Sequence, residues 1–345
     1  MLAISKTRPA PGLEVVSADI PTVKPGHVKV KIATGSVCGT DLHIFEWDAF
    51  SSGRIHPPRI IGHEFCGEII EVGEGISASR IGEFVASESH IVCGHCKQCL
   101  SGNAHVCVNT VILGIDVEGG FAGYAVIPAD NARKVPRSVS PETASMLDAL
   151  GNAVHTACAG PLEGQTVLVT GLGPIGLFSV AIAKTLGAEK IIATEVHALR
   201  KEIGIQVGAD IILDPTLEDV DQKLRKLFPE GVDATLEMSG RASSLSLAID
   251  HTRPGGRVSL LGLYPEAMQS VSMNTVVMKG LQMQGIVGRR LWDTWDTMID
   301  LLENKNLQIG PIITHKMDFR EVNHAMEILK QGKAGKVVLD FSGAY

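Results

Sequence analysis

The stretch VLVTGLGPIGLFSVAIAKTLG (residues 167–187) decides the fold class of this chain. A short apolar run opens it, a glycine-rich turn follows, and an apolar helical pattern ends at Gly187. The turn reads G-x-G-x-x-G, in which Gly171 permits the tight turn, Gly173 lets the backbone approach a pyrophosphate and Gly176 lets helix and strand pack closely. The helix N-terminus then offers N–H groups to phosphates. The stretch therefore predicts a dinucleotide-binding strand–turn–helix unit.

The same alternation of apolar strands and helical segments continues downstream. KIIATE (190–195), DIILD (210–214), VDATLEMSG (232–240) and RVSLLG (257–262) read as further buried strands. Short apolar strands separated by helices are typical of a parallel sheet that is covered on both faces. This half of the chain is therefore predicted to be a doubly wound α/β domain of the Rossmann type.

An acidic residue at the end of the second strand indicates which dinucleotide binds. Glu195 lies 19 residues beyond Gly176, where a carboxylate accepts hydrogen bonds from the adenosine ribose hydroxyls. A carboxylate there would repel the 2′-phosphate of NADP, so the prediction is NAD. Arg200 follows five residues later, and a cation near this position is what NADP sites usually have, but Arg200 could equally stack on the adenine face.

The N-terminal part has a different pattern. Residues 11–135 contain many short alternating or apolar runs separated by Gly and Pro, which indicates a β-rich domain with irregular loops. A helical stretch follows over 141–160, and the tail over 320–341 holds one more helix and a strand. We therefore expect a β-rich domain over residues 1–150, completed by 291–345, and a nucleotide-binding domain over 151–290.

Composition and charge exclude several classes of function. With 345 residues the chain is long enough for two domains. Its net charge of −7 and its lack of a basic run argue against nucleic-acid binding. No apolar run is long enough to span a bilayer, and charged residues and prolines interrupt the N-terminus too early for a secretory signal. We therefore expect a cytoplasmic protein whose thiols stay reduced.

The segment CGHCKQCLSGNAHVC (residues 93–107) carries four of the seven cysteines. In a reducing compartment this crowding favours metal binding over disulfides. The spacing C-x2-C-x2-C-x7-C lets one loop surround a tetrahedral ion, and an iron–sulfur cluster is the alternative. Four thiolates leave no open coordination position, so this zinc site would be structural. The predicted ligands are Cys93, Cys96, Cys99 and Cys107.

A second group of metal-binding side chains comes from two short motifs. VCGTDLH (37–43) offers Cys38, Thr40 and His43, and IIGHEFCGEII (60–70) offers His63 and Glu64. A thiolate, an imidazole and a carboxylate are ligands that catalytic zinc uses while one position stays open. The motifs therefore predict the site where an alcohol is activated for hydride transfer.

GHEFCGEIIEVG (62–73), the four-cysteine segment and VTGLGPIG (169–176) resemble the zinc-dependent medium-chain alcohol dehydrogenases along essentially the whole chain. The resemblance implies a GroES-like catalytic domain, a Rossmann domain and, for the bacterial-type members, a homotetramer. It implies Cys38 and His63 as catalytic zinc ligands, with Glu64 and Asp148 as acidic partners. The two separate ligand sets predict two zinc ions per chain.

The resemblance also implies a proton relay and further contacts. Zinc would stabilise the substrate alkoxide, and Thr40, the cofactor ribose hydroxyl and His43 would carry the proton out. His90 would face the substrate pocket. Further cofactor contacts would come from Pro174, Ile175, Leu261, Gly262, Leu263, Ile286 and Val287.

Five stretches indicate the substrate within this family. They resemble members that oxidise the secondary alcohol of L-threonine to 2-amino-3-oxobutanoate, and they are CGTDLHIFEWD (38–48), SHIVCGHC (89–96), DALGNAVHTA (148–157), LEMSG (236–240) and PIITH (311–315). Glu46, Phe50 and Arg290 depart from those members. A polyol dehydrogenase acting on sorbitol or butane-2,3-diol is the alternative enzyme. A protein that is not an enzyme is the other alternative, namely a zinc-containing sensor that binds NAD without turnover. Thr40 and His43 argue against it, because a sensor needs no proton relay.

Overall fold

The computed structural model describes residues 1–345, which divide into two compact units. The first unit contains Met1–Ala149, Arg290–Trp295 and Ile313–Tyr345, and the second contains Leu150–Arg289 and Asp296–Ile312. The C-terminal stretch expected to complete the first domain is thus divided, since residues 296–312 belong to the second unit. None of the helices is long and apolar enough to cross a membrane.

The first unit is rich in β-structure, as predicted for the GroES-like part of the chain. Its strands are β1 (Leu2–Lys6), β2 (Glu14–Ser17), β3 (His27–Ser36), β4 (Arg59–Ile60), β5 (Phe65–Val72), β6 (Phe84–Ser87), β7 (His90–Ile91), β8 (Val111–Ile112), β9 (Tyr124–Pro128), β10 (Ala132–Lys134), β17 (Ile313–Asp318) and β18 (Lys336–Asp340). Its helices are α1 (Gly39–Glu46), α2 (Ala49–Arg54), α3 (Lys97–Leu100), α4 (Pro141–Ser145) and α12 (Val322–Lys330).

A seven-stranded sheet organises this unit. Its order is β10-β6-β5-β3-β18-β17, and β9 also pairs with β3. The long strand β3 alternates half-buried and buried residues, because only one of its faces packs on the core. Strand β18, from the end of the chain, pairs antiparallel with the end of β3 and sets Val338 opposite Ser36. The C-terminal segment is therefore built into the sheet beside the residues that follow β3.

The second unit is the predicted Rossmann fold. Its six parallel strands lie in the order β13-β12-β11-β14-β15-β16, in which the chain order reverses between β11 and β14. The strands are β11 (Thr166–Thr170), β12 (Lys190–Thr194), β13 (Ile211–Leu213), β14 (Val232–Glu237), β15 (Thr252–Leu260) and β16 (Gln282–Gly285). The helices that lie wholly within it are α6 (Pro174–Thr185), α7 (Ala198–Gln206), α8 (Val220–Leu227), α9 (Ala242–His251) and α10 (Met273–Lys279).

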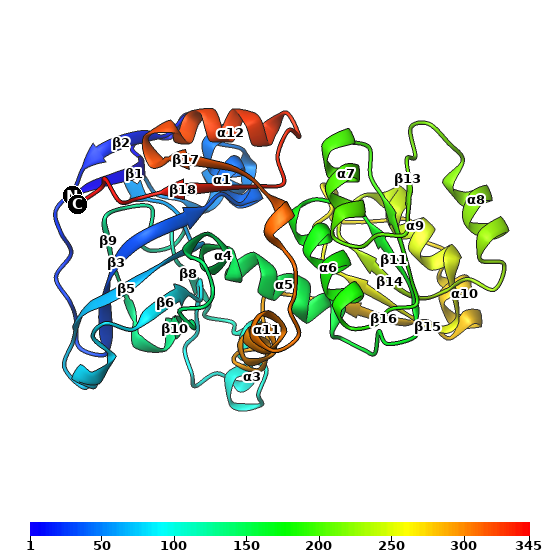
Figure 1. Cartoon of the computed structure of the whole chain (residues 1–345), viewed down its shortest axis with the longest axis horizontal. Coiled ribbons are helices and arrows are strands. Elements are labelled where there is room, and N and C mark those ends of the chain that lie inside the picture. The colour runs from blue at the N-terminus through cyan, green and yellow to red at the C-terminus, as the bar shows by residue number, and fades with distance from the viewer. The chain divides into compact units, whose positions relative to one another are not determined.

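Helices cover both faces of this parallel sheet. Figure 1 shows α6 and α7 on one side of it and α8, α9 and α10 on the other. The central strand β11 is buried after its first residue, as expected for a strand covered twice. Two further helices, α5 (Leu147–Ala157) and α11 (Asp293–Glu303), run from the first unit into the second.

Candidate functional site

Cys38, His63 and Glu64 are positioned by the ends of neighbouring strands in the first unit. Cys38 follows β3 and is the N-cap residue of α1, where its backbone N–H donates to Asp41 Oδ2 at 2.9 Å. His63 and Glu64 lie between β4 and β5, outside either strand. Gly62 turns the chain there with φ +93°, and a Cβ on it would lie 2.1 Å from the ring of Phe121. Because the chain bends here, both neighbouring side chains can face one ion, which a regular strand would not allow.

These three residues bring their ligand atoms within 4.8 Å of one another. His63 is 6% exposed and Glu64 is 1% exposed. His63 Nδ1 and Glu64 Oε1 are buried polar atoms with no hydrogen-bond partner. Such atoms are costly to bury unless something binds them. A zinc ion fits this site, since the donor set offers one thiolate, one imidazole and one carboxylate.

The charge around His63 also favours a cation. Burial lowers the pKa of His63, but the negative charges of Asp41, Cys38 and Asp148 outweigh this effect and raise the pKa to about 10. Asp41 is completely buried, and this burial raises the pKa of its carboxyl group. Its Oδ1 lies 3.7 Å from His63 Nδ1. A divalent cation would compensate the same excess of negative charge that holds a proton on His63.

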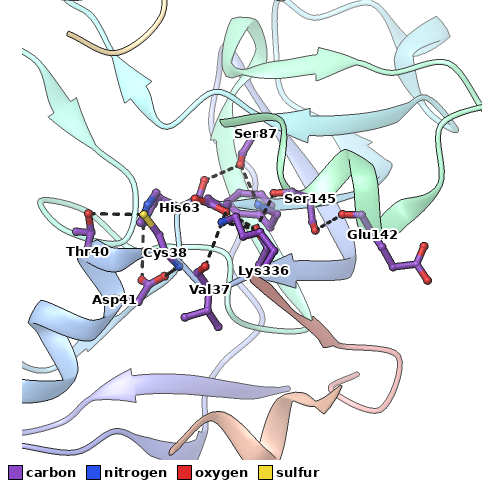
Figure 2. A network of polar contacts seen from close by, with 12 residues as sticks. Val37, Cys38, Thr40, Asp41, His63, Ser87, Glu142, Ser145 and Lys336 are labelled. Atoms are coloured by element: carbon purple, nitrogen blue, oxygen red, sulfur yellow. Dashed lines mark hydrogen bonds and ion pairs between the residues drawn. The ribbon is translucent and has the colours of Figure 1, made fainter. Parts of the chain in front are cut away.

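Lys336 is a member of this site that the sequence analysis missed. Its side chain is 1% exposed, and Nζ forms an ion pair with Glu64 Oε2. Nζ also donates to the backbone oxygen of Val37 at 3.0 Å and to Ser36 Oγ at 3.3 Å (Figure 2). Ser36 Oγ donates to the same oxygen of Glu64. One carboxylate oxygen of Glu64 is thus held by the protein, while Oε1 has no partner and remains available to a metal ion.

The other acidic partner, Asp148, lies in the first turn of α5 and is 5% exposed. Its Oδ1 accepts the backbone N–H of Ser89 at 3.2 Å. Asp148 is not among the three residues whose ligand atoms meet within 4.8 Å, although its charge acts on His63. It therefore contributes to the electrostatics of the site, and direct ligation stays a prediction.

Thr40 and His43 project from α1 three residues apart, which places them on the same side of the helix. Thr40 Oγ1 lies 3.8 Å from Cys38 Sγ, so its hydroxyl borders the candidate zinc ligands (Figure 2). The side chain of His43 is 56% exposed and lies 2.6 Å, through Nδ1, from Asp48 Oδ2. The helix thus carries one hydroxyl at the metal ligands and one imidazole at the surface.

His90 and the residues that depart from the threonine-oxidising members have defined surroundings. His90 begins β7, is half-buried and donates its backbone N–H to Glu88 Oε1 at 2.9 Å. Glu46 pairs with Lys330 of α12 at 2.9 Å, which explains an acid at this position. The Phe50 ring lies 6.0 Å from the His43 ring and is tilted to it. Arg290 is exposed, and its backbone N–H donates to Thr294 Oγ1.

The four cysteine side chains of segment 93–107 converge on one point. The ligand sulfurs of Cys93, Cys96, Cys99 and Cys107 all lie within 4.8 Å of one another, and no disulfide joins them. The recorded S···S distances are 3.5–3.8 Å, close to the separation of about 3.8 Å that a tetrahedral ion requires with Zn–S bonds of about 2.3 Å. One zinc ion therefore fits this segment.

N–H groups donate to two of these sulfurs, those of Cys93 and Cys107. Hydrogen bonding from the backbone at His95 and from the Asn109 side chain lowers the pKa of Cys93 to about 5. Cys107 Sγ accepts the backbone N–H groups of Cys93 and Asn109 at 3.4 and 3.3 Å. N–H groups directed at sulfur stabilise the thiolate, which is the form that binds metal.

The glycine-rich turn has the geometry that its sequence predicts. Gly171 has φ +87°, and a Cβ there would lie 2.9 Å from Ser239 Cβ. A Cβ on Gly176 would lie 2.0 Å from the backbone oxygen of Gly171, so only glycine lets α6 approach β11 this closely. Gly173 is the N-cap of α6, Pro174 and Ile175 form its first turn, and a Cβ on Gly173 would meet nothing within 4 Å. The open side of Gly173 is where a phosphate could approach the backbone.

Glu195 follows β12 as predicted, but its carboxylate also stabilises the turn. Oε2 accepts the backbone N–H of Leu172 at 2.9 Å, and Oε1 accepts those of Val196 and His197 at 2.7 and 2.9 Å. Glu195 is 7% exposed. The acid is therefore joined to the glycine-rich turn, and Arg200 lies half-buried on α7 nearby in the sequence.

The remaining predicted cofactor residues follow the ends of β15 and β16, at the same edge of the sheet as the glycine-rich turn. Leu261 and Gly262 donate their backbone N–H groups to Glu237 O, and Leu263 is 93% exposed. Ile286 is buried, and Val287 is 52% exposed.

Glu237, at the end of β14, is a buried residue that the sequence analysis did not identify. Its carboxylate accepts the backbone N–H and the hydroxyl of Ser239 at 2.8 and 2.6 Å and the hydroxyl of Tyr264 at 2.9 Å. It thereby ties together the loops beside the turn. A buried acid at the carboxyl end of a parallel strand, in LEMSG (236–240), is the signal that could have found it.

A cavity of about 620 Å³ lies elsewhere in the second unit. It is bounded by Gly231 and Pro254, near the amino ends of β14 and β15. Ligands of open α/β sheets bind at the carboxyl ends of the strands. The Arg and Lys side chains around this cavity have partners already, since Arg225 pairs with Asp221, Arg253 pairs with Asp233 and Lys279 donates to three backbone carbonyls. It is therefore not the nucleotide site.

Comparison with known proteins agrees with both halves of this description. Residues 24–137 match the alcohol dehydrogenase GroES-like domain, and residues 174–304 match the zinc-binding dehydrogenase domain. The L-threonine 3-dehydrogenase of Pyrococcus abyssi is 46% identical over 98% of both chains, and that of Coxiella burnetii is 42% identical over 99% of both. Among solved structures, the rspB alcohol dehydrogenase of Escherichia coli CFT073 in complex with NADH has a TM-score of 0.91 at 31% identity, over 99% of both chains.

Proposed function

The chain belongs to the family of zinc-binding alcohol dehydrogenases with a GroES-like domain, and on this premise we propose that it oxidises L-threonine to 2-amino-3-oxobutanoate with NAD. One observation carries the proposal. Cys38, His63 and Glu64 converge within 4.8 Å in a chain that aligns end to end with L-threonine 3-dehydrogenases. The overall reaction takes a hydride from the β-carbon to the cofactor and releases the hydroxyl proton.

The residues of the first unit would bind the metal ion, carry the proton and contact the substrate. When bound, zinc would act as a Lewis acid on the substrate hydroxyl, and NAD would accept the hydride. Cys38, His63 and Glu64 would hold the ion. Thr40, beside Cys38, would take up the proton of the substrate hydroxyl and pass it toward His43, whose exposed ring releases it to solvent. Asp148 would balance the charge, and His90 would border the substrate.

The loops of the second unit support the choice of NAD. Glu195 places a buried negative charge beside the glycine-rich turn, where a 2′-phosphate would be repelled. Oε2 accepts only the Leu172 N–H and retains a second lone pair, through which Glu195 would bind a ribose hydroxyl. Gly173 leaves the first turn of α6 open to the pyrophosphate. Arg200, Leu261, Gly262, Leu263, Ile286 and Val287 would complete the cofactor contacts.

We assign two zinc ions to each chain. The Cys38 set, with three protein ligands, would keep a coordination position open for the substrate, and the four-cysteine segment would be closed. The second ion would brace a loop and take no part in the chemistry. The seven free cysteines suit a reducing compartment, which supports a cytoplasmic location.

We also expect a homotetramer, for which the second unit offers a surface. Strand β16 is the edge strand of the sheet, and all four of its residues are exposed. Met278 of the neighbouring α10 is 85% exposed, and Val277 is 70% exposed. An unprotected edge beside apolar side chains suits pairing with a second copy of the chain. Sedimentation equilibrium would test this, and a monomer at micromolar concentration would contradict it.

A substrate panel tests the proposed function. The protein, with zinc and either NAD or NADP, is assayed for reduced cofactor with L-threonine, L-allo-threonine, L-serine, sorbitol and butane-2,3-diol. We expect the highest kcat/KM with L-threonine, and a loss on L-serine of about tenfold to 200-fold because the methyl group is missing. Higher efficiency with a polyol would favour the polyol dehydrogenase instead. NAD binding without any turnover would favour the nucleotide sensor.

A further inference from the structure

The exposed side chain of His43 contacts a carboxylate at the surface of the first unit. Its Nδ1 lies 2.6 Å from Oδ2 of Asp48, five residues later in the chain. A histidine ring that is more than half exposed would ordinarily sample several rotamers and both neutral tautomers. The contact with Asp48 restricts both, because an ionised carboxylate can only accept a hydrogen bond. In this contact the proton of the neutral ring must therefore reside on Nδ1.

The backbone between these residues holds the contact in place. Trp47, the C-cap of α1, has the left-handed conformation with φ 57° and turns the chain back, so that Asp48 returns beside α1. The Lys6 ammonium group lies 5.1 Å from the centroid of the Trp47 ring and donates to Phe45 O at 3.4 Å. Lys6 is fully buried. The turn that presents Asp48 is thus anchored to the core of the unit.

Asp48 uses its two oxygens for two different partners. Oδ1 caps α2 by accepting the backbone N–H of Ser51 at 3.1 Å, and Oδ2 faces His43. Slight burial raises the pKa of Asp48, but the hydrogen bonds from Ser51 and His43 outweigh this and lower it. Asp48 is thus ionised at neutral pH, and its orientation is fixed by the N-terminus of a helix.

The other charged side chains of α1 and α2 have partners of their own. Asp41, on α1, accepts the backbone N–H of Cys38 at 2.9 Å. Glu46, on α1, pairs with Lys330 of α12 at 2.9 Å. Arg54 of α2 makes two hydrogen bonds to Asp116 at 2.9 and 2.7 Å. The Phe50 ring contributes an apolar neighbour at 6.0 Å. Asp48 is therefore the carboxylate that orients His43.

We propose that Asp48 is a positioning residue that fixes His43 in the Nδ1–H tautomer, leaving Nε2 as the acceptor at the outer end of the proton path. This inference rests on the proposed function, in which His43 must accept a proton before releasing it. A ring with its proton on Nε2 would present a donor where an acceptor is required. A carboxylate at Nδ1 also stabilises the imidazolium that forms when the proton arrives.

The substitution Asp48→Asn separates this role from helix capping. Asparagine caps helices about as well as aspartate, so its Oδ1 is expected to keep the bond to Ser51 N. The amide NH₂ then faces His43 Nδ1 and requires an acceptor there, which moves the ring proton to Nε2. Glu46→Gln is the matched control. It removes a negative charge from α1, the helix that carries His43, at a residue that pairs with Lys330 and not with the His43 ring.

The tautomer is read from the ring ¹⁵N shifts of histidine-labelled, zinc-loaded full-length protein at pH 8, with His43 assigned by its loss in His43→Gln. We expect Nδ1–H in the parent protein and in Glu46→Gln, and Nε2–H in Asp48→Asn. We also expect kcat for L-threonine to fall about tenfold in Asp48→Asn, with KM within about twofold, because proton transfer and not binding is affected.

The Nε2–H tautomer in the parent protein, or an unchanged tautomer and kcat in Asp48→Asn, would overturn the proposal. If Asp48→Asn does not fold, Asp48→Ser keeps a capping oxygen but cannot reach His43, and we expect it to give mixed tautomers and the same fall in kcat. The ring signals need no substrate. A chain that fails to oxidise L-threonine but holds His43 as Nδ1–H would therefore refute the proposed function and not this contact.

Discussion

Lys336 and Glu64 form a buried ion pair although 272 residues separate them along the chain. Strand β18 carries Lys336 to the end of β3, and the bend before β5 carries Glu64 to the same point. Both side chains are at most 1% exposed. The pair explains how a carboxylate can be buried in the candidate zinc site, since an unpaired buried carboxylate would be costly.

Lys336→Met should destabilise the metal-free protein strongly. Removing one partner of a buried pair leaves the other charge uncompensated, at a cost of about 3–5 kcal/mol. Adding Glu64→Gln to Lys336→Met should restore most of this loss, because Glu64 is then no longer a buried charge without its partner. Thermal unfolding of the four proteins of this double-mutant cycle measures the coupling. Equal and additive losses from the two substitutions would show that the pair is not coupled.

The two candidate zinc sites should respond differently to chelation. A mild chelator should remove the ion of the open Cys38 set first, abolishing turnover while one zinc per chain remains. Cys99→Ser should lower stability more than it lowers kcat of the folded protein, because a closed site contributes to folding. Cys158→Ser, which replaces an exposed cysteine outside both sets, should retain two ions. The zinc content of each protein is measured by mass spectrometry. A parent protein that contains one zinc ion, or iron, would contradict the assignment of two zinc ions to each chain.

The acid dependence of the second unit should involve Asp214. Hydrogen bonds from Lys201 and Thr216 lower the pKa of Asp214 to about 2. Because this value lies below the ordinary 3.8, Asp214 contributes stability above pH 3.8, and the contribution is lost as the pH falls toward 2. Asp214→Asn should therefore lower Tm at pH 7, and its difference from the parent should shrink below pH 4. A difference that is constant from pH 7 to pH 3 would rule this out.

Local motifs made much of this architecture predictable. The glycines of 171–176 act on their own turn, so their spacing alone predicts the strand, turn and helix that the structure contains. The four cysteines lie within one loop, and their spacing alone predicts that they converge. The convergence of Cys38 with His63 and Glu64 required more than spacing, and the family resemblance supplied it.

The contacts missed from the sequence depend on how distant segments pair. Lys336 is one of several lysines in a polar tail, and only the pairing of β18 with β3 makes it a partner of Glu64. Asp48 is close to His43 in sequence, but the left-handed turn at Trp47 that joins them has no glycine to mark it. Residues 296–312 lie in the second unit because of tertiary packing that no local pattern reports.

Glu195→Ser should change the choice of cofactor. Loss of the carboxylate removes the repulsion of a 2′-phosphate, so the preference for NAD over NADP should fall at least tenfold, about 1.4 kcal/mol. NAD binding should weaken as well, for two reasons. The ribose hydroxyls would lose an acceptor, and the glycine-rich turn would lose the carboxylate that accepts Leu172 N–H.

Glu202→Ser, a change on α7 outside this contact, is the control for charge alone. Kd values for both cofactors by fluorescence titration, with kcat/KM for each, measure the effect. A parent protein that uses NAD and NADP equally well would show that Glu195 does not select the cofactor.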